Sequence, residues 1–404
     1  MTQRGAGTKL SDNFPTGNCP VILAEYTTPC PRSTGPDAFK PLPNNPPLIM
    51  KIVLPCFLAS SLLALAAPLS AQTDSPAQPY KVVNAAKVGG AGGFDYVYAD
   101  ADGRRLYVPR GNRIPIYDLD TLKQVGEIPG TNNVHGVAVD PASHHGFSSS
   151  RPLVMWDTQT LATIKTIDAQ GGPDGILFEP ATERIYVLSH RAPNVTVIDA
   201  KDGSVVGTID LGGAPEQAVS DGQGHVWIDL EDKDQVAAVD ANTLKVTAHY
   251  DLGGKGGGPA GLALDARNRI LFATCHDPRT CVILNADSGQ VIASLPIGNG
   301  TDGATFNPNT LEAFSSQGDG TLTVIKENAP DSFAVEQNVP TKPGAKTLTL
   351  DSKTNRILLI TAEYGPPPAP AAPAQAQPAG APAPRRPRRG PMVPDSFTIL
   401  VVGR

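Results

Sequence analysis

The sequence GGPDGILFEP (171–180) is followed by RIYVLS (184–189), VTVID (195–199) and VVGTIDL (205–211). Each of these four runs is rich in β-branched or alternating apolar residues and is bounded by glycine, proline, asparagine or aspartate. This is the pattern of short strands separated by tight turns. Four strands in about 42 residues match the size of a propeller blade. The segment 171–211 therefore predicts one blade.

The same unit recurs along the chain. In each copy, one residue stands just before the first strand, and an acidic residue or asparagine follows five positions later. The seven pairs are Asp95/Asp100, His135/Asp140, Asp174/Glu179, Glu216/Asp221, Ala260/Asp265, Asp302/Asn307 and Lys346/Asp351. Successive first members are 40, 39, 42, 44, 42 and 44 residues apart. Seven regular units predict an all-β, seven-bladed β-propeller with four-stranded blades.

The seventh unit has no outer strand of its own. Its strands are expected at 347–350, 356–361 and 397–402, whereas an unassigned strand at 80–88 precedes the first complete unit. Pairing of these two segments would complete the blade and remove two exposed strand edges. We therefore expect the N-terminal strand to close the ring within the last blade.

Residues 365–394 interrupt the seventh unit between its second and third strands. This segment holds eleven prolines, many alanines and the basic run RRPRR (385–389). Such a composition cannot bury a core, so it predicts a disordered or polyproline loop. The loop is either a tolerated surface insertion or a basic tether for an anionic partner.

The N-terminal region predicts export. An apolar run (52–69) follows Met50 and Lys51 and contains small residues suitable for cleavage, which is the pattern of a signal peptide. We divide the chain into a doubtful disordered extension (1–49), a signal peptide (50–71), a linker (72–79) and the propeller (80–404). The expected product is a periplasmic or secreted monomer with no membrane span in the mature chain. The alternative is a short N-terminal membrane anchor.

Composition excludes several classes of function. Charged residues make up 18% of the chain, and the net charge of −6 argues against a globally basic nucleic-acid binder. No helical pattern follows the glycine-rich loops at 89–93 and 253–258, so they lack the context of a phosphate-binding loop. The sequence contains neither a Cys-x-x-Cys-His haem motif nor a Gly-x-Ser-x-Gly nucleophile motif.

Two of the five cysteines lie in the predicted propeller. Cys275 and Cys281 flank a turn at 276–280 between two apolar stretches. They are predicted to face each other at the base of a hairpin and to form a disulfide in an oxidising compartment. The two thiols with His276 would make an incomplete metal-ligand set.

The repeat resembles the YVTN-type β-propeller repeat family, the YncE-like periplasmic proteins. The matching residues are Tyr107-Val108, Tyr186-Val187, Val197-Ile198-Asp199 and the run 202–206. The resemblance covers about 80–364 and 395–404, and no unit carries the asparagine that completes the family's eponymous motif. It implies that the loops before the innermost strands and the loops between second and third strands open on one face, around the central channel.

That face would gather two sets of polar residues. The first members of the repeat pairs form a ring in which six of seven residues are ionisable. The second set of loops adds Arg110, Arg151, His190, Glu231, His276, Asp277 and Glu363. Carboxylates and imidazoles that converge in this way could hold a divalent cation, bind a cationic or polyol ligand, or act as acid–base pairs. The second members of the pairs, such as Asp100 and Asp351, are predicted to be structural.

We expect a non-catalytic binding module that takes a small molecule or an envelope protein on this polar face. The predicted ligand-binding residues are Asp95, His135, Asp174, Glu216, Asp302, Lys346, Arg110, His190, Glu231 and His276. No cofactor is assigned, although a divalent cation is compatible with the ring. The alternative is a lactonase-like hydrolase, with or without a metal, that uses the histidines and carboxylates of the same funnel.

Overall fold

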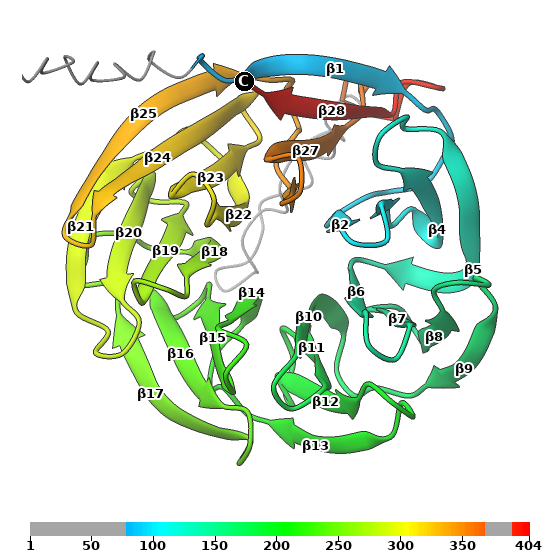
Figure 1. The fold of residues 1–404 in the computed structure, drawn as a ribbon, viewed down its shortest axis with the longest axis horizontal. Helices are drawn as coiled ribbons and strands as arrows, with labels where there is room; N and C mark the ends of the chain where they lie inside the picture. Colours follow the sequence, from blue (N-terminus) through cyan, green and yellow to red (C-terminus); the bar gives the residue numbers. More distant parts are fainter. Residues whose placement is uncertain (1–77, 368–389) are drawn as a thin grey trace, which may run out of the picture. The chain divides into compact units, whose positions relative to one another are not determined.

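The computed structural model describes residues 78–367 and 390–404. Within these residues the chain forms seven four-stranded antiparallel sheets arranged as blades around a central axis (Figure 1). This confirms the predicted seven-bladed β-propeller. The described part of the chain contains no helix long and apolar enough to cross a bilayer. The predicted extension, the signal peptide and the basic run 385–389 lie outside the described residues.

Each blade is a meander in which the innermost strand comes first. Blade 1 holds β2 (Tyr98–Asp100), β3 (Arg105–Tyr107), β4 (Gly111–Asp118) and β5 (Gln124–Val134). Blade 2 holds β6 (Val137–Asp140), β7 (His145–Ser148), β8 (Leu153–Asp157) and β9 (Thr163–Ile167). Blade 3 holds β10 (Pro173–Glu179), β11 (Arg184–Ser189), β12 (Val195–Asp199) and β13 (Val205–Ile209). Blade 4 holds β14 (Pro215–Ser220), β15 (His225–Leu230), β16 (Gln235–Asp240) and β17 (Lys245–Asp251). Blade 5 holds β18 (Pro259–Asp265), β19 (Ile270–Cys275), β20 (Thr280–Asn285) and β21 (Val291–Pro296). Blade 6 holds β22 (Thr301–Asn307), β23 (Glu312–Gln317), β24 (Thr321–Ala329) and β25 (Ser332–Pro340).

Blade 7 closes the ring as predicted. It combines β26 (Leu348–Asp351), β27 (Arg356–Thr361), β28 (Thr398–Gly403) and, on the outside, β1 (Lys81–Lys87). Strands β1 and β28 run antiparallel, with Lys81 opposite Gly403 and Lys87 opposite Thr398. The insertion leaves the blade after β27 and returns before β28. There the amide of Gly365 donates to the carbonyl of Pro391 at 2.8 Å.

The second members of the repeat pairs have the structural role predicted for them. Each stands at the end of an innermost strand and accepts hydrogen bonds from the turn that follows. Asp140 accepts from the amide of Ala142 at 2.9 Å, and Asp265 accepts from the amide of Arg267 at 2.9 Å. These bonds satisfy turn amides that no strand partner reaches, so the carboxylates fix the turn between the first two strands.

The core lies between blades rather than in one centre. Seven apolar clusters each fill the space between two neighbouring sheets. Between blades 1 and 2, for example, the fully buried Tyr107 and Trp156 pack with ring centroids 6.0 Å apart. Because every sheet is buried on both faces, the inner strands are held on a rigid scaffold, and the loops that they carry have fixed positions.

The predicted disulfide between Cys275 and Cys281 is wrong: both are buried free thiols. The register explains why. Cys281 lies opposite Thr274, so Cys275 is one residue out of step with it, and adjacent residues of a strand point to opposite faces of the sheet. Cys275 packs in the cluster between blades 4 and 5, and Cys281 packs in the cluster between blades 5 and 6. The blade itself therefore separates the two sulfur atoms.

Candidate functional site

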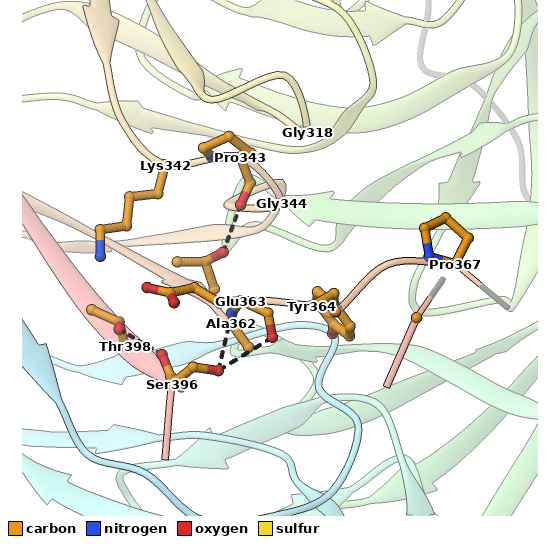
Figure 2. A pocket seen from close by; sticks show the side chains of 13 residues that line it. Gly318, Lys342, Pro343, Gly344, Ala362, Glu363, Tyr364, Pro367, Ser396 and Thr398 are labelled. Atoms are coloured by element: carbon orange, nitrogen blue, oxygen red, sulfur yellow. Dashed lines mark hydrogen bonds between the residues drawn. The ribbon is translucent and has the colours of Figure 1, made fainter. Parts of the chain in front are cut away.

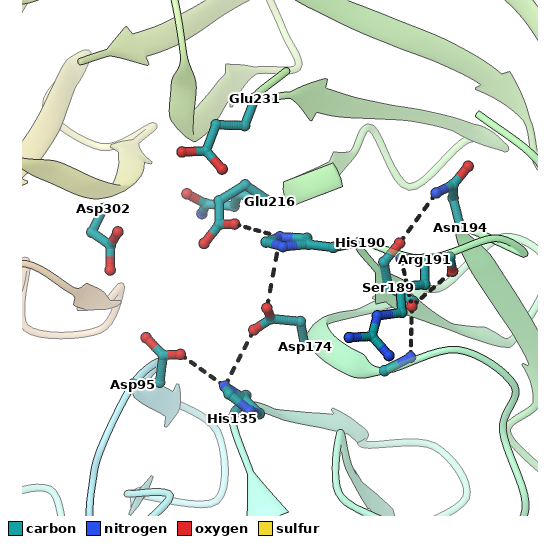
Figure 3. Close-up of polar contacts among 12 residues, drawn as sticks. Asp95, His135, Asp174, Ser189, His190, Arg191, Asn194, Glu216, Glu231 and Asp302 are labelled. Carbon is teal, nitrogen blue, oxygen red and sulfur yellow. Dashed lines mark hydrogen bonds and ion pairs between the residues drawn. The ribbon is translucent and has the colours of Figure 1, made fainter. Parts of the chain in front are cut away.

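The polar ring converges on the top face, which we define as the side where the loops that precede the innermost strands open. Six residues of the ring, together with one residue from the second set of loops, lie side by side there (Figure 3). We call this group the top-face site: Asp95, His135, Asp174, His190, Glu216, Asp302 and Lys346. The sequence predicted all seven as ligand-binding residues, and the structure brings them together.

Two histidines alternate with three carboxylates across one half of the top-face site. His135 Nδ1 lies 2.9 Å from Asp95 Oδ2 and 3.3 Å from Asp174 Oδ1. His190 Nε2 lies 3.7 Å from Asp174 Oδ2 and 2.9 Å from Glu216 Oε2. The result is a continuous chain from blade 1 to blade 4 in which each imidazole faces two carboxylates (Figure 3).

A glycine in β10 permits this close approach. A Cβ atom on Gly175 would lie 2.6 Å from the carbonyl oxygen of Glu216, closer than side chains in proteins come. With no Cβ there, the innermost strands of blades 3 and 4 approach far enough for Asp174 and Glu216 to share His190. A glycine also follows the ring residue in blades 2, 5 and 6, at Gly136, Gly261 and Gly303.

The other half of the top-face site is an ion-pair cluster. The ammonium group of Lys346 contacts the Asp302 carboxylate and lies 3.8 Å from Asp95 Oδ1. Because Asp95 also bonds His135, it links the two halves. Lys346 therefore faces carboxylates of two different blades, Asp95 of blade 1 and Asp302 of blade 6.

The electrostatics follow from this arrangement. The hydrogen bond to Glu216 raises the pKa of His190 to about 9, and the hydrogen bond to Asp95 raises the pKa of His135. Burial, followed by repulsion from Glu216, raises the pKa of Asp174 to about 6. Excess negative charge therefore favours protons on the histidines. The same field favours any other cation of suitable size.

Three hydrogen-bonding residues that support the top-face site were missed by the sequence argument. The Tyr96 hydroxyl donates to Glu216 Oε1 at 2.8 Å, from the opposite side of the ring. The side-chain amide of Gln217 donates to the carbonyl of Ala304 at 3.0 Å, and the Thr347 hydroxyl donates to the carbonyl of Asp95 at 2.6 Å. A signal was present: these three stand directly after a ring residue, where the other four units have glycine.

A cavity of about 380 Å³ lies along the axis beneath the top-face site. The innermost strands form its walls, mainly with apolar side chains such as Val137, Ile176 and Leu348, and Tyr96 and Glu216 also line it. The hydrogen bond between Tyr96 and Glu216 therefore lies at the wall of this cavity.

Arg110, which the sequence predicted to bind a ligand, is buried and does not join the top-face site. Its side chain is only 2% exposed, and its guanidinium lies 3.7 Å over the Phe397 ring. It donates to the carbonyls of Gly89, Gly90 and Gly92, the last two at 2.8 and 3.3 Å. Burial lowers its pKa to about 10. Arg110 thus organises the glycine-rich loop before β2 and is unavailable to a ligand.

Glu231 and His276 lie at a second position on the same face. His276 Nε2 is 3.8 Å from Glu231 Oε1, and both line a cavity of about 430 Å³ with Asp232, Asp234 and Asp277. Glu231 still contributes to the field that raises the pKa of His190. The structure therefore places these two predicted residues beside the top-face site and not within it.

A larger cavity, about 690 Å³, lies between blades 6 and 7, beside the residues from which the insertion leaves and to which it returns (Figure 2). It is lined by Lys342, Glu363 and Tyr364, among others, and it was not predicted from the sequence. The Ser396 hydroxyl there donates to the carbonyl of Val393 at 2.7 Å and accepts the amide of Glu363 at 3.0 Å. These bonds hold the backbone of the cavity wall in place.

Comparison with known proteins supports the fold and adds little on chemistry. No protein-family model matches the chain, and no curated protein matches it in sequence. Two similar solved structures are that of U3-55K, with 12% identity, and that of the RRP9 WD40 repeats, with 13% identity. Each has a TM-score of 0.61 and covers 80% of this chain, and the matches span 98% and 97% of those chains. The neighbours are WD40 β-propellers, and at this identity the likeness concerns the fold alone.

Proposed function

We propose that the protein is an exported binding module that takes a cationic ligand at the top-face site and does not catalyse a reaction on it. The ligand is a divalent cation, a cationic small molecule or a positively charged group of an envelope protein. The observation that carries this proposal is the convergence of four carboxylates, those of Asp95, Asp174, Glu216 and Asp302, with only two histidines and one lysine paired to them among the described residues of the site.

Burial strengthens the case for a ligand. The side chains of Asp174, Glu216 and Asp302 are 20%, 14% and 16% exposed, so they cannot be fully hydrated. Gathering partly buried like charges costs free energy. Among the described residues, the positive charges that face these carboxylates are those of Lys346 and the protonated histidines, and the Tyr96 hydroxyl donates one hydrogen bond to Glu216. A cation offsets this cost. The rigid scaffold places the carboxylates before the ligand arrives, which reduces the entropic cost of binding.

Export rests on the sequence. The apolar run at 52–69 behind Lys51 supports a signal peptide, and the strand motifs support a place among the YVTN-type periplasmic propellers. The similarity to WD40 propellers is compatible with a role in recognition, because propellers commonly bind ligands and partner proteins on a face of this kind.

The test is a stability screen of the full chain, stripped of metal with EDTA, against metal ions, alkyl amines and basic peptides. A ligand at 100 times its Kd stabilises the folded state by about 2.7 kcal/mol, so a true ligand raises the melting temperature. Asp174→Asn should abolish that rise, and Glu183→Gln, which removes an equal charge at an exposed surface position, should not. If no cation stabilises the chain, or if Asp174→Asn responds fully, the proposal is refuted.

A hydrolase remains the second candidate because of one observation. Asp174, whose pKa is raised to about 6, stands between two histidines and could accept a proton near neutral pH. Turnover on a panel of lactones that disappears in Asp174→Asn would favour the enzyme. No turnover, together with saturable binding of a cation, would favour the binding module.

A further inference from the structure

We infer that the cationic ligand of the top-face site is a pair of divalent metal ions bridged by the Asp174 carboxylate. This inference rests on the proposed function and makes it specific. The described residues contain two groups with metal-ligand geometry, Asp95–His135–Asp174 and Asp174–His190–Glu216. In each group the candidate ligand atoms all lie within 4.8 Å of one another, and Asp174 belongs to both.

The two oxygens of Asp174 are directed to different partners. Oδ1 lies 3.3 Å from His135 Nδ1, and Oδ2 lies 3.7 Å from His190 Nε2. A carboxylate that paired with a single imidazole would contact either His135 or His190, but not both. A carboxylate that bridges two metal ions offers one oxygen to each, which is the arrangement found here (Figure 3).

The spacings within each group suit metal coordination. In a tetrahedral site with bonds of about 2.0–2.1 Å, two ligand atoms are about 3.3 Å apart. The four nitrogen–oxygen separations are 2.9, 3.3, 3.7 and 2.9 Å, which lie on both sides of that value. The nitrogen–oxygen separations in both groups are therefore close to those of a metal site.

An independent observation concerns Asp174 Oδ1. This oxygen is buried, yet it accepts no hydrogen bond from the described part of the chain. A buried carboxylate oxygen that accepts no hydrogen bond is unfavourable. A metal ion between Oδ1 and His135 Nδ1 would satisfy it. Asn133 already lies 3.0 Å from the other ring nitrogen, Nε2, and so orients the imidazole.

The donor set indicates which ions fit. Each site offers one imidazole nitrogen and two carboxylate oxygens, which suits first-row divalent ions such as Zn²⁺ or Mn²⁺ better than Ca²⁺, which prefers oxygen ligands alone. Tyr96 donates to Glu216 Oε1, so Oε2 remains directed at His190 as a single ligand atom. Three protein ligands per ion leave at least one position open for water or for an exogenous ligand.

The experiment is equilibrium dialysis of the EDTA-treated full chain against ZnCl₂, and separately MnCl₂, with bound metal counted by mass spectrometry. We expect two ions per chain. His135→Ala and His190→Ala should each retain one ion, because each removes a ligand of one site only. Asp174→Asn should weaken both sites together. His225→Ala, which removes an exposed histidine of blade 4, should retain two.

The single-histidine variants keep the test informative even if Asp174→Asn folds poorly, and circular dichroism reports the fold of each variant. Fewer than two ions bound by the unmodified chain, or two ions retained by His135→Ala or His190→Ala, would overturn the bridged pair. If alkyl amines or basic peptides bind but metals do not, this inference fails and the proposed function stands. If no cation binds, both fail.

Discussion

The pairing of His190 with Glu216 gives a measurable property of the unliganded top-face site. His190 Nε2 lies 2.9 Å from Glu216 Oε2, and this bond raises the histidine pKa from 6.5 to about 9. Glu216→Gln removes the carboxylate charge while it keeps the size of the side chain. An opposite charge at this distance changes a pKa by about 1–3 pH units, so the His190 pKa should fall by at least about 1 unit.

The sign of the pH dependence follows from the raised value. A histidine whose pKa is higher in the folded state stabilises that state fully below its unfolded pKa of about 6.5, and this contribution disappears as the pH rises through about 9. Direct conversion would give about 3 kcal/mol. Because the side chain is 42% exposed, solvent screening reduces the expected contribution to about 1 kcal/mol.

The assay is a histidine NMR titration of the metal-free chain, with the His190 resonance assigned from His190→Asn. Glu183→Gln serves as the charge-matched control, and it should leave the His190 pKa unchanged. A His190 pKa near 6.5 in the unmodified chain, or a pKa near 9 that persists in Glu216→Gln, would show that the two side chains do not pair as described.

Three further predictions concern the scaffold. Arg110→Met should lower the free energy of unfolding, measured by urea titration, by about 3 kcal/mol or more, because three carbonyls lose a charged hydrogen-bond donor. A variant with unchanged stability that no longer binds a cation would instead show that Arg110 contacts the ligand. Burial raises the pKa of Asp351, but hydrogen bonds, chiefly from Arg104, outweigh it and lower the pKa overall. Asp351→Asn should therefore destabilise the chain by about 1–3 kcal/mol at pH 7, and the difference from the unmodified chain should disappear as the pH falls through the lowered pKa of Asp351. Cys275 and Cys281 should both react with a thiol reagent in denaturant without reductant and neither in the native state; one disulfide per chain would contradict the register described above.

Periodicity was sufficient to predict the fold because a propeller repeats one local pattern. Each blade has its own turns and its own alternation of apolar residues, so seven copies report the same architecture independently. Ring closure was predictable as well, since a blade with only three strands can be completed by the unpaired strand at the other end of the repeats. The cysteine pairing depended on register at the level of a single residue, which the sequence pattern of Cys275 and Cys281 does not determine.

The top-face site was predictable in part for the same reason. Equivalent positions in a closed ring must face a common axis, so the residues that precede the innermost strands had to converge. Arg110 shows the limit of that reasoning. It occupies a loop of the predicted set, but the carbonyls of a glycine-rich loop and the Phe397 ring surround it. Whether a side chain turns toward the axis or into the wall depends on neighbours from distant parts of the chain.

The different positions of His190 and His276 follow from the ring residues around them. Both histidines come directly after the second strand of a blade, so the repeat makes them equivalent. His190 lies between two carboxylates, Asp174 of its own blade and Glu216 of the next. The corresponding positions for His276 are Ala260, which has no charge, and Asp302, whose carboxylate contacts Lys346. With neither partner available, His276 is 3.8 Å from Glu231 of the preceding blade. The alternation of histidines and carboxylates therefore ends at Glu216, because blade 5 has Ala260 at its ring position and the blade 6 carboxylate, Asp302, pairs with Lys346.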